Sequence, residues 1–88
     1  MCDNCKDVIL TEYFYSPKDY MNCLAYIKTL LETEKFELIK ADCPIDCVRA
    51  KNGGWYDDII LHQIQCKECQ KVFTCICNTY RGGGSFQP

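Results

Sequence analysis

The chain has 88 residues, 9 cysteines and a formal net charge of -2 at pH 7. A chain of this length holds one domain, 1–88, and its small core needs a further cross-link for stability. Acidic and basic residues are interspersed throughout, which excludes a phosphate-binding stripe and argues against nucleic acid as a partner.

The N-terminal stretch MCDNCKDVIL has an acidic residue where a secretion signal needs positive charge, and it contains no sustained apolar run. We therefore expect neither a signal peptide nor a membrane span, and we expect a cytoplasmic location. In a reducing compartment, paired cysteines are typical of metal binding rather than of disulfides. An odd number of cysteines also cannot pair completely within one chain.

The segment SPKDYMNCLAYIKTLLETEK predicts an amphipathic helix. Ser16 is the expected N-cap, Pro17 takes the first helical position, and Asp19 lies near the positive end of the helix dipole. Apolar residues recur at helical spacing along one face, which we expect to pack on a sheet. These residues are Tyr20, Cys23, Leu24, Ile27, Leu30 and Leu31.

Strands are predicted over 36–41 (FELIKA), 55–66 (WYDDIILHQIQC) and 71–80 (KVFTCICNTY), with a tight turn at KNGG, 51–54. The segment DVILTEYFY is compatible with either strand or helix. The last predicted strand carries apolar groups on both faces, so we expect it to be central: Phe73, Cys75 and Cys77 share one face, and Val72, Ile76 and Tyr80 the other. The fold class is therefore α+β, with one amphipathic helix packed on a 3-4 stranded antiparallel sheet and a zinc-ribbon-like CxxC hairpin.

The pairs Cys2-x2-Cys5 and Cys66-x2-Cys69 predict a metal site. Each CxxC turn offers two thiolates, and two such turns complete the tetrahedron that structural zinc prefers. About sixty residues separate the pairs, so the zinc would tie the N-terminus to the hairpin before the last predicted strand. Lys6 and Gln70 stand where a glycine would ease each turn. Reduced thiols without metal and iron–sulfur ligation by the same cysteines are the alternatives.

The other cysteines admit two interpretations. Cys43, Cys47, Cys75 and Cys77 can form a second metal site or serve as accessory thiols, or they can behave as small buried hydrophobic residues, as Cys23 does on the helix face. A thiol redox protein is a further alternative. It needs a CxxC pair at a helix N-terminus, whereas Cys66-x2-Cys69 is predicted between two strands.

No catalytic constellation is visible in the sequence, and we expect a non-enzymatic protein. His62 is the only histidine and lies in a predicted strand, on the face opposite Ile59 and Leu61, which favours a structural role over a general base. Asp57 and Asp58 are adjacent in the same predicted strand, so we expect them to point to opposite faces.

The RGGGS stretch lacks the lysine and the spacing of a phosphate loop. We interpret its glycines as a sharp turn that lets Phe86 fold back on the last predicted strand.

The string IQCKECQKVFTCICNTYRGGGSF, with FELIKADCPID and GGWYDDIILHQIQC before it, resembles a family of small bacterial cytosolic proteins that have a C-terminal CxxC hairpin and a TYRGGGSF-like tail. Such proteins are similar in kind to the immunity proteins of bacterial contact-dependent and other polymorphic toxin systems, which bind and block a toxin domain. The resemblance implies a zinc-stabilised module whose partner is a protein.

Aromatic residues supply the expected contacts with that partner, because these residue types anchor protein interfaces. The candidate partner-binding residues are Trp55, Tyr56, Tyr80, Arg81 and Phe86. Ordinary core packing is the other interpretation of the aromatic residues. A zinc-ribbon nucleic-acid binder is an alternative function, and it would require basic residues such as Lys67, Lys71 and Arg81 to gather on one face.

Overall fold

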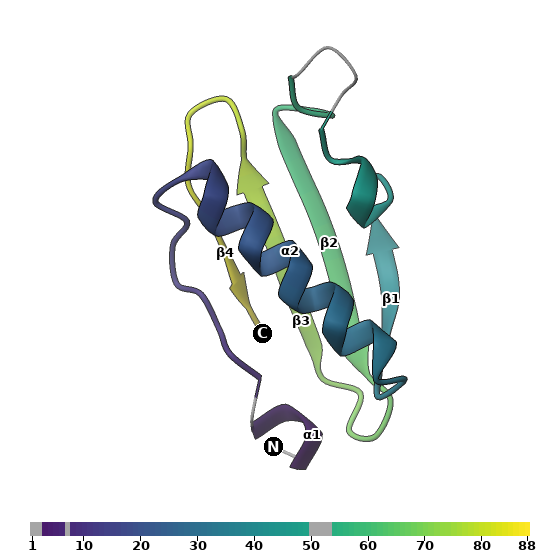
Figure 1. Ribbon diagram of the computed structural model, residues 1–88. Coiled ribbons are helices and arrows are strands. Elements are labelled where there is room, and N and C mark those ends of the chain that lie inside the picture. Colours follow the sequence, from purple (N-terminus) through teal and green to yellow (C-terminus); the bar gives the residue numbers. More distant parts are fainter. Residues whose placement is uncertain (1–2, 7, 50–53) are drawn as a thin grey trace.

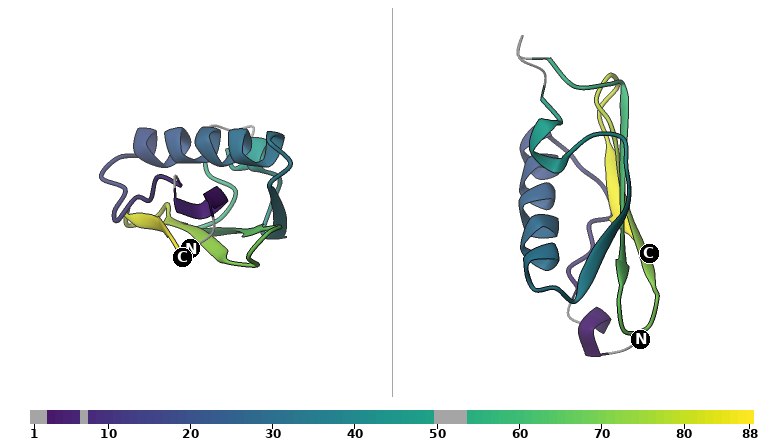
Figure 2. Two further views of the ribbon diagram at one scale, coloured as in Figure 1. Left: turned by 90° about the horizontal axis from the view of Figure 1, so that it is seen from below. Right: turned by 90° about the vertical axis from the view of Figure 1, so that its right-hand side faces the viewer.

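The computed structural model describes residues 3–6, 8–49 and 54–88, with the backbone alone at residues 3 and 4. Helix α2 (Pro17–Glu32) packs on one face of an antiparallel four-stranded sheet with the strand order β1-β2-β3-β4, so the molecule has two layers (Figures 1 and 2). The strands are β1 (Phe36–Ala41), β2 (Ile59–Cys66), β3 (Val72–Asn78) and β4 (Gly84–Gln87), and two short helices are α1 (Asp3–Lys6) and η1 (Ile45–Cys47). The predicted α+β class is confirmed.

Helix α2 begins and packs as its sequence predicts. The Oγ of Ser16 accepts a hydrogen bond from the backbone N–H of Asp19 at 3.3 Å, and Pro17 occupies the first turn. The face that is buried against the sheet comprises Tyr20, Cys23, Leu24 and Ile27, while Leu30 and Leu31 are half-buried beside it. The apolar stripe thus holds the helix on the sheet.

Strand β3 lies between β2 and β4, which confirms the prediction that it is central. Its inner face buries Phe73, Cys75 and Cys77 beneath the helix, whereas the opposite face is half-buried. Strand β2 alternates in the same way. The helix covers only one face of the sheet, so buried residues in the two central strands alternate with half-buried residues on the uncovered face.

Strand β2 is shorter than predicted, because it begins at Ile59 rather than at residue 55. The Oγ of Thr79 donates to the carbonyl of Asp57 at 2.6 Å, and the N–H of Thr79 donates to the carbonyl of Asp58 at 2.7 Å. Tyr56 donates its N–H to Val48 instead of joining the sheet. The residues before Ile59 are therefore held as a loop.

The glycine-rich turn returns the chain as strand β4, which pairs with β3 and places Phe86 in the core. This confirms the interpretation of RGGGS as a turn. The segment before α2, which the sequence left open, runs beside β4: Thr11 pairs with Phe86, and the N–H of Phe14 donates to the carbonyl of Gly84. Residues 51–53 of the predicted KNGG turn lie outside the described residues.

Replacement of Gly84 by alanine is expected to destabilise the fold strongly. Gly84 has φ +143, and an added Cβ would lie 2.2 Å from the carbonyl oxygen of Ile76, which is sheet backbone and cannot move aside. We expect a loss of about 3 kcal/mol or more in the free energy of unfolding. Gly82→Ala is the matched control, because Gly82 also has positive φ but faces open space. Urea unfolding that gave equal losses for both variants would contradict this account.

Candidate functional site

Three of the four cysteines in the predicted metal site come together at one end of the molecule. Cys5 lies in α1, Cys66 is the last residue of β2, and Cys69 lies in the turn between β2 and β3. Their Sγ atoms all lie within 4.8 Å of one another, and the Sγ atoms of Cys5 and Cys69 are 3.3 Å apart. The right-hand view of Figure 2 shows α1 beside the β2–β3 turn. Cys2 lies outside the described residues.

The donor set fits a structural zinc ion. Zinc binds thiolates at about 2.3 Å, so tetrahedral geometry places neighbouring sulfur atoms roughly 3.8 Å apart. Sulfur atoms within 4.8 Å of one another need only small shifts to reach that arrangement. Cys5 and Cys66 are buried and Cys69 is exposed, so one side of the cluster faces the protein interior and the other side faces solvent. Within the described residues, this is the cysteine cluster that can hold a metal ion.

Backbone hydrogen bonds hold the turn that presents Cys66 and Cys69. The N–H of Gln70 donates to the carbonyl of Cys66 at 3.0 Å, and the N–H of Cys66 donates to the carbonyl of Lys71 at 2.9 Å. Gln70 has φ 68, the left-handed conformation that favours glycine. The position where a glycine was expected to ease the turn therefore does adopt a glycine-like conformation, at the cost of strain in Gln70.

Gln70→Gly is expected to stabilise the turn by about 1 kcal/mol, because glycine adopts positive φ without a steric penalty. Thermal unfolding measures the effect. Gln63→Gly in strand β2 is the control and should lower stability, since glycine weakens a strand interior. If Gln70→Gly lowered the melting temperature as much as the control did, the turn conformation described here would be wrong.

A metal at this cluster would have a large effect on the unfolded chain, because Cys5 and Cys69 are 64 positions apart. A cross-link that closes a loop of this length destabilises the unfolded state by about 4 kcal/mol in the chain-entropy description. Helix α2 and strands β1 and β2 lie inside the loop, while β3 and β4 follow it. For a core of this size, such a contribution is comparable with the whole net stability.

Cys69→Ser is expected to weaken zinc binding and to lower the free energy of unfolding by about 2–4 kcal/mol, because it removes one thiolate from the cluster. Cys47→Ser is the matched control: Cys47 is also exposed but lies outside the cluster. The measurements are zinc content by mass spectrometry and melting temperature with and without a chelator. Equal zinc content and equal melting temperatures for the two variants would show that the cluster does not hold the metal.

The predicted second metal site is wrong. Cys43, Cys47, Cys75 and Cys77 are all described, and they do not form a group of ligand atoms close enough to share an ion. Cys47 is exposed, whereas the other three are buried in the core. The sequence placed Cys75 and Cys77 correctly on one strand face, but that face packs on apolar residues of the helix.

The buried thiols are poor nucleophiles. The pKa of Cys75 is raised well above its usual range by its hydrogen bond with Cys23 and by burial, and burial also raises the pKa of Cys77 and of Cys43. The hydrogen bond from Cys75 lowers the pKa of Cys23. Because the thiolate is the reactive form, three of these four residues act as hydrophobic core groups rather than as redox centres.

His62 is buried on the inner face of β2, opposite the outward-facing Ile59 and Leu61, as predicted. Its Nε2 lies 2.6 Å from the carbonyl oxygen of Cys43, which fixes the ring against the loop after β1. The Nδ1 of His62 and the hydroxyl of Tyr20 are buried without a hydrogen-bond partner among the described residues. A histidine so enclosed serves packing and cannot reach a substrate in solvent.

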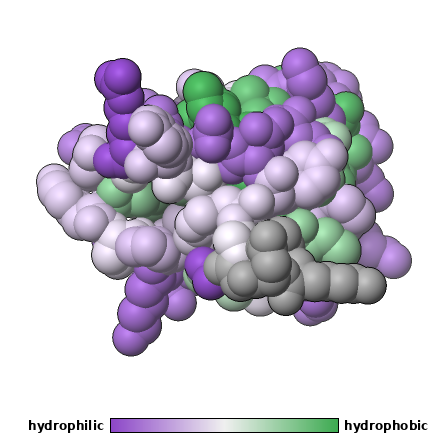
Figure 3. Space-filling view, turned by 90° about the horizontal axis from the view of Figure 1, so that it is seen from above, coloured by the Kyte–Doolittle hydropathy of each residue, from purple (hydrophilic) through white to green (hydrophobic). Residues whose placement is uncertain are grey.

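Aromatic residues from distant parts of the chain meet at the end of the molecule opposite the thiol cluster. The rings of Tyr13 and Tyr15 meet edge to face with 4.9 Å between their centroids, and Tyr15 and Trp55 line the same pocket. Trp55 in turn shares a second hollow with Tyr56 and Tyr80. We call this region the aromatic end. Four tyrosines there are strongly exposed: Tyr13 (50%), Tyr15 (84%), Tyr56 (52%) and Tyr80 (78%). Figure 3 looks onto this end, where much of the surface has the pale shade of intermediate hydropathy.

Two of the predicted partner-binding residues differ in exposure, because Phe86 is buried and Arg81 is exposed. Phe86 is 0% exposed and packs on Phe73, so its predicted role in partner binding is wrong. Arg81 lies in the turn between β3 and β4, beside the aromatic end. Lys67 and Lys71 lie at the other end of β3, so the three basic residues proposed for a nucleic-acid face are separated.

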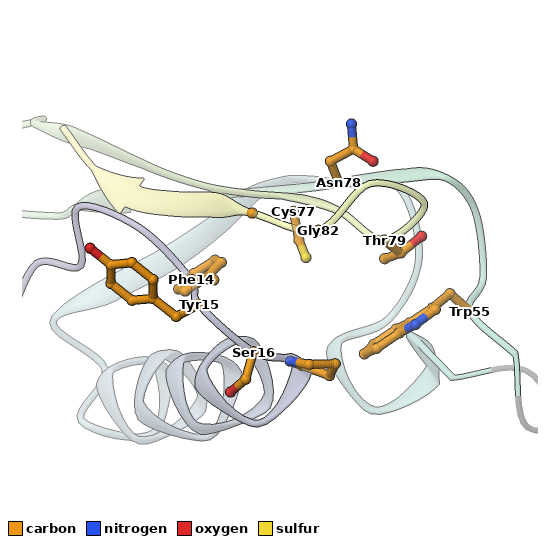
Figure 4. A pocket seen from close by; sticks show the side chains of 10 residues that line it. Phe14, Tyr15, Ser16, Trp55, Cys77, Asn78, Thr79 and Gly82 are labelled. Carbon is orange, nitrogen blue, oxygen red and sulfur yellow. The ribbon is translucent and has the colours of Figure 1, made fainter.

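The pocket at the aromatic end has a volume of about 80 Å³ and is bounded by α2, Trp55 and the glycine turn. Figure 4 shows Phe14, Cys77 and Trp55 arranged around the hollow, while the side chain of Asn78 points away from it. Trp55 itself is held in place, because it packs on Tyr20 at 5.7 Å and carries the guanidinium of Arg49 at 4.5 Å from its ring centroid. Tyr15 was not among the predicted partner-binding residues, because nothing local in the sequence shows that it lines one pocket with Trp55.

Comparison with protein-family models, curated proteins and solved structures finds no match to this chain. Among the described helices, none is both long enough and apolar enough to cross a lipid bilayer. The thiol cluster and the aromatic end are the two features of the described residues that bear on function.

Proposed function

We propose that this protein is a non-enzymatic, zinc-stabilised binding module that acts as an immunity protein, blocking a bacterial toxin domain through its aromatic end. The observation that carries the proposal is the group of exposed tyrosines at the aromatic end. Tyr15 lines the pocket, Tyr56 and Tyr80 line the adjoining hollow, and Tyr13 packs against Tyr15. Tyrosine offers a large contact area with little loss of side-chain freedom, which is why it is enriched at the centres of interfaces.

The rigid support of these tyrosines favours binding with high affinity. The Tyr13 hydroxyl lies against Gly83, and the loop that carries Tyr56 is fixed by its hydrogen bond to Val48. A preorganised surface loses less conformational entropy when a partner binds. The zinc ion would hold the other end of the fold with Cys5, Cys66 and Cys69, and Cys2 is the fourth ligand that we propose.

The two alternative functions have less support. A nucleic-acid binder needs a continuous basic face, but Arg81 is separated from Lys67 and Lys71 by the length of β3. A thiol redox enzyme needs an accessible thiol with a depressed pKa. The pKa of Cys23 is lowered, but this thiol is buried on the inner face of the helix. The pKa values of Cys43, Cys75 and Cys77 are raised.

A genetic selection tests the proposal. Fragments of the source genome are expressed in a bacterial host with and without this protein, and fragments that stop growth only in its absence are collected. We expect at least one such fragment, and its purified product should bind the protein in equimolar amounts by calorimetry. The double variant Tyr15→Ala/Tyr80→Ala should lose protection and weaken binding by about a hundredfold or more, as loss of two interface anchors does.

The control for this selection is Ile39→Ala, which removes an exposed apolar side chain in strand β1, outside the aromatic end. It should protect as well as the unchanged protein. Absence of any protected fragment, or equal loss of protection in the control and in the tyrosine variant, would refute the proposed function.

A further inference from the structure

Two hollows adjoin at the aromatic end and differ in chemistry. The first is the pocket of about 80 Å³ between α2 and the glycine turn, and its walls include Phe14, Pro17 and Gly82. The second is a more open hollow of about 460 Å³ that includes Tyr56, Asp57, Asp58 and Tyr80. Trp55 and Thr79 line both, so a single bound segment can reach the two hollows at once.

Two carboxylates line the second hollow. Within the described part of the chain, neither Asp57 nor Asp58 forms an ion pair with a lysine or arginine. The sequence led us to expect these side chains on opposite faces of a strand, and that expectation is wrong. Both residues precede β2 in a loop, and both line the same hollow. Two carboxylates beside two tyrosine rings form a surface that attracts a cationic side chain.

The acidic loop is already held in position. Thr79 binds the carbonyl groups of Asp57 and Asp58 through its side chain and its N–H, and the Oδ1 of Asp57 accepts the N–H of Asp58 at 2.7 Å. The loop therefore need not be ordered when a ligand binds, which lowers the entropic cost of binding.

The first hollow suits an aliphatic group. An apolar cavity of about 150 Å³ holds a benzene molecule, so a space of about 80 Å³ fits a smaller side chain. Most of its walls are aromatic residues, Pro17, two glycines and the thiol of Cys77, which burial keeps neutral, while Ser16 and Thr79 add polar atoms at its edge. A side chain of the size of valine would replace solvent there without placing a polar group against an apolar wall.

We propose that the aromatic end recognises a protein segment that carries an aliphatic side chain next to an arginine or lysine. The aliphatic group enters the pocket beside Phe14 and Trp55, and the cation lies between Asp57, Asp58 and the ring of Tyr80 or Tyr56. This inference rests on the proposed function in that it assigns the partner's contact chemistry, and it applies to a protein segment rather than to a small cation alone.

Short glycine–serine peptides that carry one valine and one arginine, separated by none, one or two residues, are the probes. Binding is measured from amide shifts of Ser16, Thr79 and Gly83 in nuclear magnetic resonance titrations at about 0.15 M salt, where distant charges are screened. We expect saturable shifts for at least one spacing. The same peptide with glutamate in place of arginine, or serine in place of valine, should bind at least about tenfold more weakly.

A double-mutant cycle identifies the contact of the arginine. Replacing arginine by glutamine in the peptide should weaken binding to the unchanged protein but not to Asp57→Asn/Asp58→Asn, because the carboxylates are then absent. Glu34→Gln/Glu37→Gln is the control, since it removes the same charge from exposed positions outside the hollow. The control should retain the full arginine effect.

Three results would overturn the inference: no saturable binding by any peptide, equal binding of the glutamate peptide, or an arginine effect that persists in Asp57→Asn/Asp58→Asn. The genetic selection gives an independent answer about the function. A protected toxin fragment together with failed peptide binding would support the proposed function and refute the inference. Peptide binding without any protected fragment would support the inferred contact chemistry and refute the proposed function.

Discussion

The convergence of Cys5, Cys66 and Cys69 is the constraint on which the rest of the structure depends. One helix on one face of four strands buries a small core, and the outer face of the sheet is only half-covered. A core of this kind gives marginal stability, so a cross-link that joins the N-terminal segment to the β2–β3 turn has a large relative effect. A metal ion bound there would also hold the start of the segment that runs along β4.

That segment connects the two ends of the molecule. It leaves α1 near the thiols, pairs with Phe86 at Thr11, and delivers Tyr13 and Tyr15 beside the glycine turn (Figure 1). The edge of β4 is thereby covered, which removes one free strand edge from the sheet. The thiol cluster and the exposed tyrosines of the aromatic end are thus joined by one stretch of chain.

The core contains polar groups that the fold does not fully satisfy. The Tyr20 hydroxyl and the His62 Nδ1 have no hydrogen-bond partner among the described residues, and the burial of Tyr20 raises its pKa well above the usual range. Each such group costs about 1–3 kcal/mol. These costs lower the net stability of the fold, so a cross-link would have a larger relative effect. Burial gives the inner thiols and the histidine structural rather than chemical roles.

The local elements and the convergence of Cys5, Cys66 and Cys69 were predictable from the sequence alone. Helical spacing determined which face of α2 is buried, strand alternation identified β3 as central, and the CxxC spacings selected the thiols that meet. The glycines of the tail, with positive φ at Gly83 and Gly84, determined that Phe86 folds back. Each of these features follows from residues close together in the chain or from a pattern whose chemistry admits few arrangements.

Only the tertiary structure decided which separate elements share a surface. Tyr15 and Trp55 line one pocket at the start of α2, Asp57 and Asp58 line one hollow because Thr79 holds them before β2 begins, and Phe86 is buried instead of available to a partner. Likewise, Cys43 and Cys47 do not join Cys75 and Cys77. Periodicity reports which face of an element is apolar, but strand register and turn conformation decide what that face contacts, and these depend on residues far apart in the sequence.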